Sequence, residues 1–175
     1  MSVPAITRQL AELHYAIGHC SLGSVLVARG EQGVCAVLLG DDPESISREL
    51  ESRFPDTTLL RRDEALAQYL AQVVGVIEAP GRPLDLLLDL RGTTFQLQVW
   101  QALREIPAGT TSTYSKVASR IGAPKAVRAV ARACATNPLA LVVPCHRVIG
   151  KDSGLTGYRW GLERKRILLE RESRR

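Results

Sequence analysis

The sequence has no apolar stretch long enough to span a lipid bilayer, and its first residues, Met1 to Ala5, do not form a basic and apolar leader. It also lacks Cys-x-x-Cys pairs, which argues against a zinc knuckle and a dithiol redox motif. Internal repeats and low-complexity segments are missing too. We therefore expect a cytoplasmic globular protein whose four cysteines are thiols, because the cytosol is reducing. They are Cys20, Cys35, Cys134 and Cys145.

Lysine is missing from the first half of the chain. Residues 1–90 hold 7 Arg and 13 Asp or Glu, a net charge of −6, whereas residues 91–175 hold 16 Lys or Arg and 5 Asp or Glu, a net charge of +11. Positive charge gathered in one half is the pattern expected when one face of a protein meets a polyanion such as DNA. The alternative is a solvated basic surface without a partner.

The first half is expected to form a small α/β unit. Four short apolar or alternating runs predict strands, the first three as an antiparallel meander: 13–18, 23–29, 33–39 and 84–90. Helices are predicted to begin at Asp42 and at Asp63, where an acid that can cap precedes an apolar face. Because the charge changes sign near residues 85–94, we expect a structural domain over 1–90 and a second domain over 91–175.

The second half is predicted to be mostly helical. A helix over 95–103 is followed by two shorter helices, over 114–121 and from Pro124 to about Ala135, which are joined by a turn at Gly122. Two short helices joined in this way fit a helix-turn-helix. A last helix is expected from about Leu162 into the charged tail.

The second helix of this pair has the composition of a DNA-reading helix. Lys125 is expected in its first turn, where a phosphate would also be favoured, and Arg128 and Arg132 lie four residues apart on one face. Alanines keep the helix surface thin, which suits the narrow minor groove better than base reading by long side chains. The alternative is an Ala-rich helix buried against the core, with arginines that reach out to solvent.

The run Pro144 to Val148 holds the most reactive candidate, Cys145. It follows the β-branched run 141–143, which predicts a buried strand with the cysteine at its end. A thiol with a pKa of roughly 8.5 needs a nearby base to become a thiolate at neutral pH. His146 is adjacent, but it can reach the thiol only in a turn or through a water. An acid should orient this histidine, and five are available: Glu105, Asp152, Glu163, Glu170 and Glu172. The alternative is that Cys145 is a buried structural thiol.

Further motifs accompany this run in a fixed order. They are Arg91-Gly92-Thr93, Phe95-Gln96, Trp100 to Leu103, Lys125 to Val130 and Gly157 to Gly161. With Pro144 to Val148, they resemble the O6-alkylguanine-DNA alkyltransferases, and most closely the C-terminal repair domain of bacterial Ada proteins. The resemblance runs from about Tyr15 to Glu172. It implies an α+β fold, in which a ribonuclease H-like domain with an antiparallel sheet precedes a mostly helical domain with a winged-helix-like helix-turn-helix.

The resemblance implies DNA repair by a monomer that needs no cofactor. An alkyl group, mainly methyl, would pass from O6 of a flipped guanine in duplex DNA to Cys145 in a single, irreversible turnover, with O4-alkylthymine as a further candidate lesion. His146 would act as base through a water, Glu172 rather than Glu170 would orient it, and Tyr114 would protonate the guanine ring. Arg128 would fill the gap left by the flipped base.

The remaining positions implied by the resemblance contact DNA or shape and support the pocket. Those expected at the DNA are Lys125, Ala126, Val127, Ala129 and Arg132. Asn137 would link the reading helix to the active-site turn, and backbone groups at Cys145, Val148 and 156–159 would read the guanine edge. Those expected to line or support the pocket are Asn137, Pro144, Arg147, Val148, Thr156, Gly157, Tyr158, Arg159 and Trp160.

The sequence departs from this family in three ways. Some relatives bind zinc in the N-terminal domain, but His14, His19, Cys20 and Cys35 do not match that set, so no metal is expected. Arg159 stands where some relatives offer a hydroxyl to the substrate, which leaves its backbone N–H for that role. Trp160 stands where some relatives have glycine, and we expect it to narrow the pocket in favour of methyl over benzyl groups.

Two other functions remain open, as does the extent of the protein. A non-enzymatic helix-turn-helix protein could bind alkylated DNA without repairing it, but family members of that kind lack the cysteine that is present here as Cys145. A cysteine hydrolase would not require a helix-turn-helix or a half-chain charge of +11. Longer relatives carry a Cys-rich N-terminal module, so this chain is either a free-standing repair enzyme or a piece of a longer regulator.

Overall fold

The computed structural model describes residues 10–174, so the expectation about a leader at the start of the chain lies outside the described residues. Four strands form one sheet in the order β3-β2-β1-β4. They are β1 (Glu12–Cys20), β2 (Gly23–Arg29), β3 (Val34–Gly40) and β4 (Thr58–Arg61). The predicted antiparallel meander of the first three strands is confirmed. The short strand β4, which pairs parallel with β1, was not predicted, because four residues carry too little alternation to be recognised.

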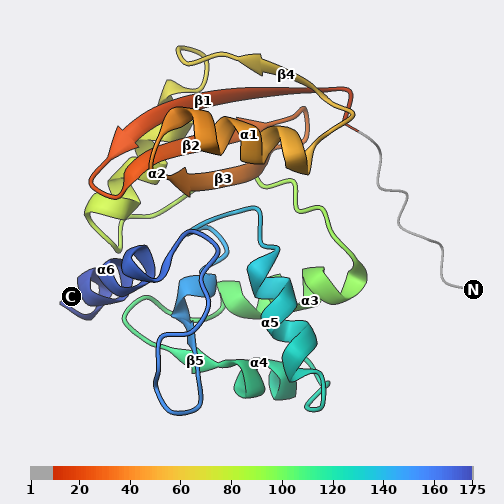
Figure 1. Ribbon diagram of the computed structural model, residues 1–175, viewed down its shortest axis with the longest axis vertical. Coiled ribbons are helices and arrows are strands. Elements are labelled where there is room, and N and C mark those ends of the chain that lie inside the picture. The colour runs from red at the N-terminus through yellow and green to blue at the C-terminus, as the bar shows by residue number, and fades with distance from the viewer. Residues whose placement is uncertain (1–9, 175) are drawn as a thin grey trace, which may run out of the picture.

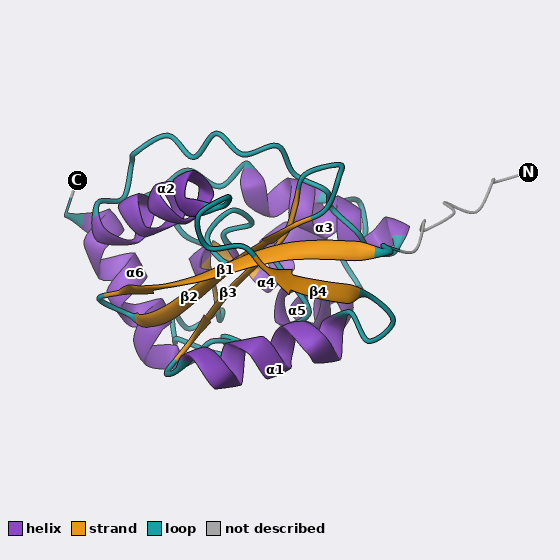
Figure 2. Cartoon of the chain, turned by 90° about the horizontal axis from the view of Figure 1, so that it is seen from above, coloured by secondary structure: helices purple, strands orange, loops and turns teal. Residues whose placement is uncertain are grey.

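Helices α1 (Pro43–Arg53) and α2 (Ala67–Glu78) cover opposite faces of this sheet (Figures 1 and 2). Residues 24–28 of β2 are therefore all buried. Asp42 caps α1 as predicted, accepting a hydrogen bond from the Ser45 N–H at 2.8 Å. The predicted start of the second helix at Asp63 is wrong. Residues 63–66 form a turn, and the Asp63 carboxylate instead accepts hydrogen bonds from the Ile17 backbone and the Arg61 side chain.

The segment between the sheet and the later helices is extended but is not the strand predicted over 84–90. Its pairing is limited to an isolated bridge between Leu88 and Val34. Two backbone hydrogen bonds hold it there, from Val34 to Leu87 at 2.8 Å and from Asp89 to Val34 at 2.9 Å. The chain thus passes the start of β3 and turns away before a ladder can form.

The rest of the chain is mostly helical. Its helices are α3 (Thr94–Arg104), α4 (Tyr114–Arg120), α5 (Val127–Ala135) and α6 (Leu162–Ser173), and β5 (Ser112–Thr113) pairs parallel with β6 (Val148–Ile149). The predicted helix over 95–103 and the Thr113 cap of α4 are confirmed. The second helix of the predicted pair begins at Val127 rather than at Pro124, so Lys125 lies in the turn before the helix.

The apolar run 141–143 is a buried turn, so the predicted strand is wrong. Leu141 has a φ of 71°, which no strand residue adopts. Just before this turn, backbone hydrogen bonds of 2.9 Å join Val37 of β3 to Pro138 and to Ala140. The apolar side chains are thus buried between the two parts of the molecule, and Cys145 follows in a single 3-10 turn, Cys145–Arg147.

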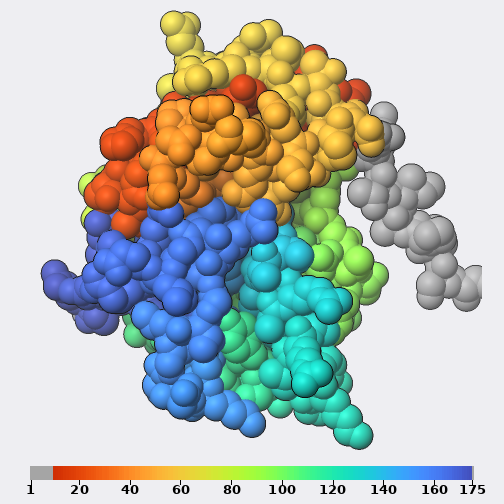
Figure 3. Space-filling model, viewed as in Figure 1, coloured from red at the N-terminus to blue at the C-terminus, as the bar shows by residue number. Residues whose placement is uncertain are grey.

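One hydrophobic core runs through both parts of the chain, which pack directly on each other (Figure 3). Trp100 of α3 is buried and donates its indole N–H to the carbonyl of Ala133 in α5 at 2.9 Å. The four-stranded sheet and the helical second part together confirm the predicted α+β class. Within residues 10–174, no helix has the length and apolar character required to cross a membrane.

Candidate active site

The 3-10 turn buries Cys145, of which 5% is exposed, and holds its sulfur in place. The side-chain amide of Asn137 donates to Cys145 Sγ at 3.2 Å and to the Val143 carbonyl at 2.9 Å. Asn137 is fully buried and lies two residues after the end of α5 at Ala135. Asn137 thus lies between α5 and the turn that holds Cys145.

His146, Arg147 and Glu172 form a buried polar group beside this turn. Glu172 Oε1 lies 2.9 Å from His146 Nε2, and the same carboxylate accepts from Arg147 Nε and Nη2 at 3.0 and 2.8 Å. A carboxylate at Nε2 fixes the proton on that nitrogen, so Nδ1 carries the lone pair. Within residues 10–174, Nδ1 is buried without a hydrogen-bond partner, and it is therefore free to take up a proton.

The pKa values of Cys145, His146 and Glu172 keep the cysteine protonated until a base removes its proton. Burial raises the pKa of Cys145 to about 11, although the Asn137 hydrogen bond and the charge of Lys165 pull it down. Burial lowers the pKa of His146, while Glu172 raises it. Burial also raises the pKa of Glu172, but the hydrogen bonds from His146 and Arg147 outweigh this and hold it at about 2. At neutral pH the site thus holds a thiol, a carboxylate and a neutral imidazole.

A pocket of about 430 Å³ opens onto Cys145. Its other lining residues come from α4, α5 and the loop before α6: Tyr114, Ala131, Cys134, Ala135, Thr156, Gly157, Tyr158 and Arg159. Tyr114 donates its hydroxyl to the Thr156 carbonyl at 3.2 Å, and burial raises the pKa of Tyr114, so its proton stays in place at neutral pH. The pocket thus joins a nucleophile and a proton donor.

Lys165 supports this pocket and was missed by the sequence analysis. It is fully buried, and its ammonium donates to the carbonyls of Val148 at 2.5 Å, Thr156 at 2.9 Å and Gly157 at 3.3 Å. It thereby ties the pocket loop to β6. Backbone groups of Val148 were expected to read the guanine edge, and the carbonyl of this residue accepts the bond from Lys165. Spacing could have revealed Lys165, because Lys165, Leu168 and Glu172 share the buried face of α6.

Helix α5 presents the predicted DNA-contacting residues at the surface. Arg128, Ala129 and Arg132 are exposed, and Ala126 and Val127 are half-buried. The opposite face of α5 packs inward through Val130, Ala133 and Cys134. Lys125 is also exposed, in the turn that leads into the helix. The small-residue face and two arginines thus lie on the helix that ends at Ala135, two residues before Asn137.

Several predicted pocket residues support the site from outside it. Pro144 is the residue before the 3-10 turn, and Arg147 binds Glu172 and the Ile106 carbonyl, the latter at 2.6 Å. Trp160 is buried but is not among the residues that line the pocket. Its ring packs edge-on against Tyr158, with centroids 5.4 Å apart. Trp160 thus packs behind a residue that lines the pocket and does not line it itself.

The first part of the chain shows no metal centre in the described residues. Within residues 10–174, no three His, Cys, Asp or Glu side chains are grouped so that they could hold a metal ion. His14 pairs with Glu12 at 2.7 Å, and Cys20 and Cys35 are buried free thiols.

Two family models match the chain. One, described as 6-O-methylguanine DNA methyltransferase, DNA binding domain, matches residues 94–174. The other, described as 6-O-methylguanine DNA methyltransferase, ribonuclease-like domain, matches residues 13–90. Together they span almost all of the described chain.

Individual proteins show the same similarity. The bifunctional transcriptional activator/DNA repair enzyme Ada of Escherichia coli is 50% identical over 161 residues, which are 92% of this chain but only 46% of that protein. The inducible methylated-DNA–protein-cysteine methyltransferase of Bacillus subtilis is 43% identical over 79% of each chain. The crystal structure of Mycobacterium tuberculosis OGT in complex with DNA has a TM-score of 0.79 at 37% identity, covering 92% of this chain and 93% of that one. The chain thus spans about half the length of the Ada protein and nearly all of the mycobacterial structure.

Proposed function

The chain belongs to the 6-O-methylguanine DNA methyltransferase family, and from this membership we propose that it repairs DNA by moving an alkyl group, mainly methyl, from O6 of guanine to Cys145. One observation carries the proposal. Cys145 lies in a pocket next to an exposed Arg- and Ala-bearing helix, beside a histidine that is oriented by a buried carboxylate.

The first step is binding and extrusion of the damaged nucleotide. O6 of guanine faces inward in the duplex, so its alkyl carbon becomes accessible only when the base leaves the stack, which costs a few kcal/mol. We propose that α5 enters the minor groove, where its alanines allow close approach, and that Arg128 fills the space left by the base. Arg132 and Lys125 would bind phosphates beside it.

The second step is activation of the thiol. Because burial raises the pKa of Cys145 to about 11, the group is a thiol at neutral pH, so a base is needed. His146 takes up the thiol proton at Nδ1 through a water, and Glu172 stabilises the imidazolium that forms. The fully ionised state of Glu172 at neutral pH makes it suited to this role.

The third step is the displacement itself. The Cys145 sulfur forms a bond to the alkyl carbon, the carbon–O6 bond breaks, and its electron pair passes to the guanine ring. Tyr114 donates a proton to that ring and regains one from the His146 imidazolium, so the thiol proton ends on guanine. The product is a thioether, which none of the described groups is placed to cleave. We therefore propose one turnover per molecule.

The proposal divides the work between two domains, residues 1–90 and 91–175. The first is structural, and the second binds DNA and accepts the alkyl group. The cytoplasm is the proposed compartment, because Cys20, Cys35, Cys134 and Cys145 are all free thiols, as a reducing environment requires.

A mass measurement tests the function. The protein is incubated with a duplex that contains one O6-methylguanine, digested, and the peptide with Cys145 is weighed. We expect a gain of one methyl in place of a hydrogen, in at most one copy per protein molecule. Tight binding of the duplex without a change in mass would instead support a protein that binds lesions without repair. A parallel duplex with O4-methylthymine tests the wider substrate range.

A further inference from the structure

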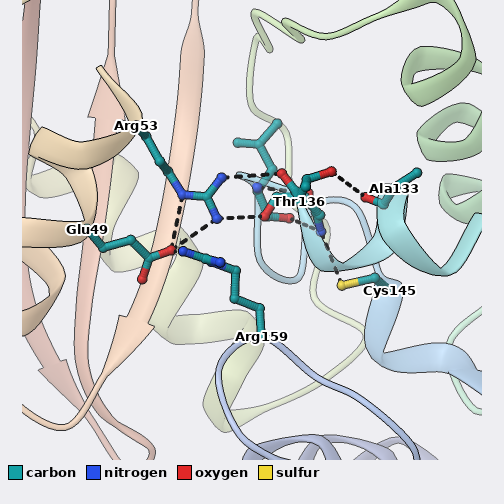
Figure 4. Close-up of polar contacts among 8 residues, drawn as sticks. Glu49, Arg53, Ala133, Thr136, Cys145 and Arg159 are labelled. Carbon is teal, nitrogen blue, oxygen red and sulfur yellow. Dashed lines mark hydrogen bonds and ion pairs between the residues drawn. The ribbon is translucent and has the colours of Figure 1, made fainter. Parts of the chain in front are cut away.

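Glu49 of α1 lies where the first part of the chain meets the pocket (Figure 4). Its Oε1 accepts hydrogen bonds from Nε of Arg159 at 2.8 Å and from Nε and Nη2 of Arg53 at 3.1 and 3.0 Å. The side chains of Glu49 and Arg53 are only 17% and 16% exposed. Solvent therefore screens this pairing less than it screens a surface ion pair.

The first branch from Glu49 reaches the pocket loop. Arg159 is the last of four consecutive residues, Thr156 to Arg159, that form one wall of the pocket. Lys165 holds the start of this wall through the Thr156 and Gly157 carbonyls. The ion pair with Glu49, 110 residues away in sequence, holds its end. The loop is thus tied at one end within its own part and at the other to α1.

The second branch reaches the nucleophile. Arg53 donates through Nη1 to the Thr136 carbonyl at 3.3 Å and through Nη2 to the Asn137 carbonyl at 3.4 Å. Asn137 in turn donates its side-chain amide to Cys145 Sγ at 3.2 Å. The Glu49 carboxylate is therefore connected to both sides of the pocket. It reaches the pocket loop through Arg159 and the Cys145 thiol through Arg53 and Asn137.

We propose that Glu49 is a positioning residue for alkyl transfer, through which the sheet part of the protein controls the pocket without touching the substrate. This inference rests on the proposed function. Without the carboxylate, the guanidinium groups of the mostly buried Arg53 and the half-exposed Arg159 would repel each other. The pocket loop would then move outward, and a displacement of about 1 Å is enough to slow a reaction that depends on alignment.

The test uses Glu49→Gln, which removes the charge and keeps the shape. Single-turnover rates are measured over a range of concentrations of a duplex with one O6-methylguanine, giving a maximal rate and a half-saturating concentration. We expect the maximal rate to fall about tenfold while the half-saturating concentration stays within about twofold, because the α5 surface is unchanged. The matched control is Glu44→Gln on the same helix, which breaks the exposed pair with Arg48 and should leave both constants unchanged.

A second set of variants separates positioning from general damage to the fold. Arg53→Gln combined with Arg159→Gln should reproduce the loss, and adding Glu49→Gln to this pair should cost nothing more. Arg159→Gln alone, at a half-exposed position, should slow the maximal rate even if Glu49→Gln fails to fold. An unchanged maximal rate in Glu49→Gln, or a further loss in the triple variant, would overturn the inference. A wild-type protein that takes up no methyl would overturn the proposed function instead.

Discussion

The sheet part and the helical part of the molecule each bury two free cysteines, and a comparison of Cys35 with Cys145 shows what a buried thiol needs in order to react. Cys35 of β3 is 2% exposed, donates to the Ala28 carbonyl at 3.6 Å, and has its pKa raised to about 12 by burial and by the charge of Asp89. Cys145 is almost as buried, but Asn137 donates to its sulfur, the charge of Lys165 lowers its pKa, and His146 is the next residue in the chain. Burial alone makes a thiol inert, and the turn at Cys145 supplies the partners that the strand at Cys35 cannot.

The largest expected effect comes from removing each thiol in turn. Cys145→Ala should abolish methyl uptake from an O6-methylguanine duplex, because the proposed transfer forms its new bond at the Cys145 sulfur. Cys35→Ala removes one buried sulfur from the sheet and should lower the free energy of unfolding by roughly one to a few kcal/mol. Methyl uptake should stay intact. Intact-protein mass spectrometry measures methyl uptake by both variants. Methyl uptake by the Cys145→Ala variant would erase the contrast between the two cysteines.

Glu172→Gln tests whether an oriented histidine is what makes Cys145 reactive and distinguishes it from Cys35. The single-turnover rate should fall about 100-fold, since the variant loses the charge that stabilises the imidazolium. In the wild type, the pKa of His146 is lowered from its ordinary value of 6.5, so the imidazole is still mostly neutral at pH 6.5. The rate should therefore be maintained at this pH and fall only when the pH drops through the lowered pKa. Without Glu172, which raises the pKa of His146, this fall should move to still lower pH. Rates between pH 5 and 8 measure both effects.

The control for this variant is Glu170→Gln on the same helix. Glu170 pairs with Arg166 and lies at the surface, 43% exposed, and it was the nearest alternative acid in the sequence. Its removal should leave the rate and its pH dependence unchanged. An equal loss of rate in both variants would mean that the rate depends on the integrity of α6 and not on the carboxylate at His146.

Much of this site could be predicted because its parts are local in sequence. The apolar alternation of β1 to β3 fixed the meander, Thr113 marked the start of α4, and the Pro144 to Val148 motif marked the nucleophile. The acid that orients His146 was a choice among five in the residue pattern, and only the family resemblance selected Glu172. The structure now places it 2.9 Å from the imidazole.

The elements that failed depend on contacts between distant segments. The β-branched run 141–143 favours a strand, but Val37 of β3 pairs with Pro138 and Ala140 and leaves the run to fold as a turn between the two parts. Glu49 and Arg159 are 110 residues apart, and no spacing rule connects them. Contacts between residues this far apart depend on the tertiary structure, so local sequence patterns cannot predict them.

Lys165→Met tests how firmly the helical part must hold its pocket loop. The variant removes a buried ammonium that donates to three carbonyls and should destabilise the protein by about 1–3 kcal/mol, because buried acceptors lose their partner. Transfer should slow about tenfold as the loop loosens. Thermal unfolding and single-turnover rates measure the two effects. The exposed Lys151, earlier in the same loop, provides the control, and an equal effect of Lys151→Met would show that charge rather than anchoring is responsible.

The smallest expected effect concerns the wall behind the pocket. Trp160 is 4% exposed and packs against the pocket residue Tyr158, so Trp160→Gly should let the Tyr158 ring recede. We expect the rate with O6-benzylguanine to rise by a factor of about three to ten, while the rate with O6-methylguanine changes little. Loss of a buried indole also destabilises the core by roughly 3–5 kcal/mol, so rates are compared well below the unfolding temperature.

Trp160→Phe separates size from loss of packing. Within residues 10–174, the Trp160 indole N–H has no hydrogen-bond partner, so phenylalanine gives up no bond and keeps an aromatic ring against Tyr158. It should raise the benzyl rate less than glycine does. If neither variant gains activity on O6-benzylguanine, Tyr158 is held by His146 and the loop rather than by Trp160. The choice between methyl and benzyl groups would then lie with the residues that line the pocket directly, and Cys134 and Arg159 would be the first to vary.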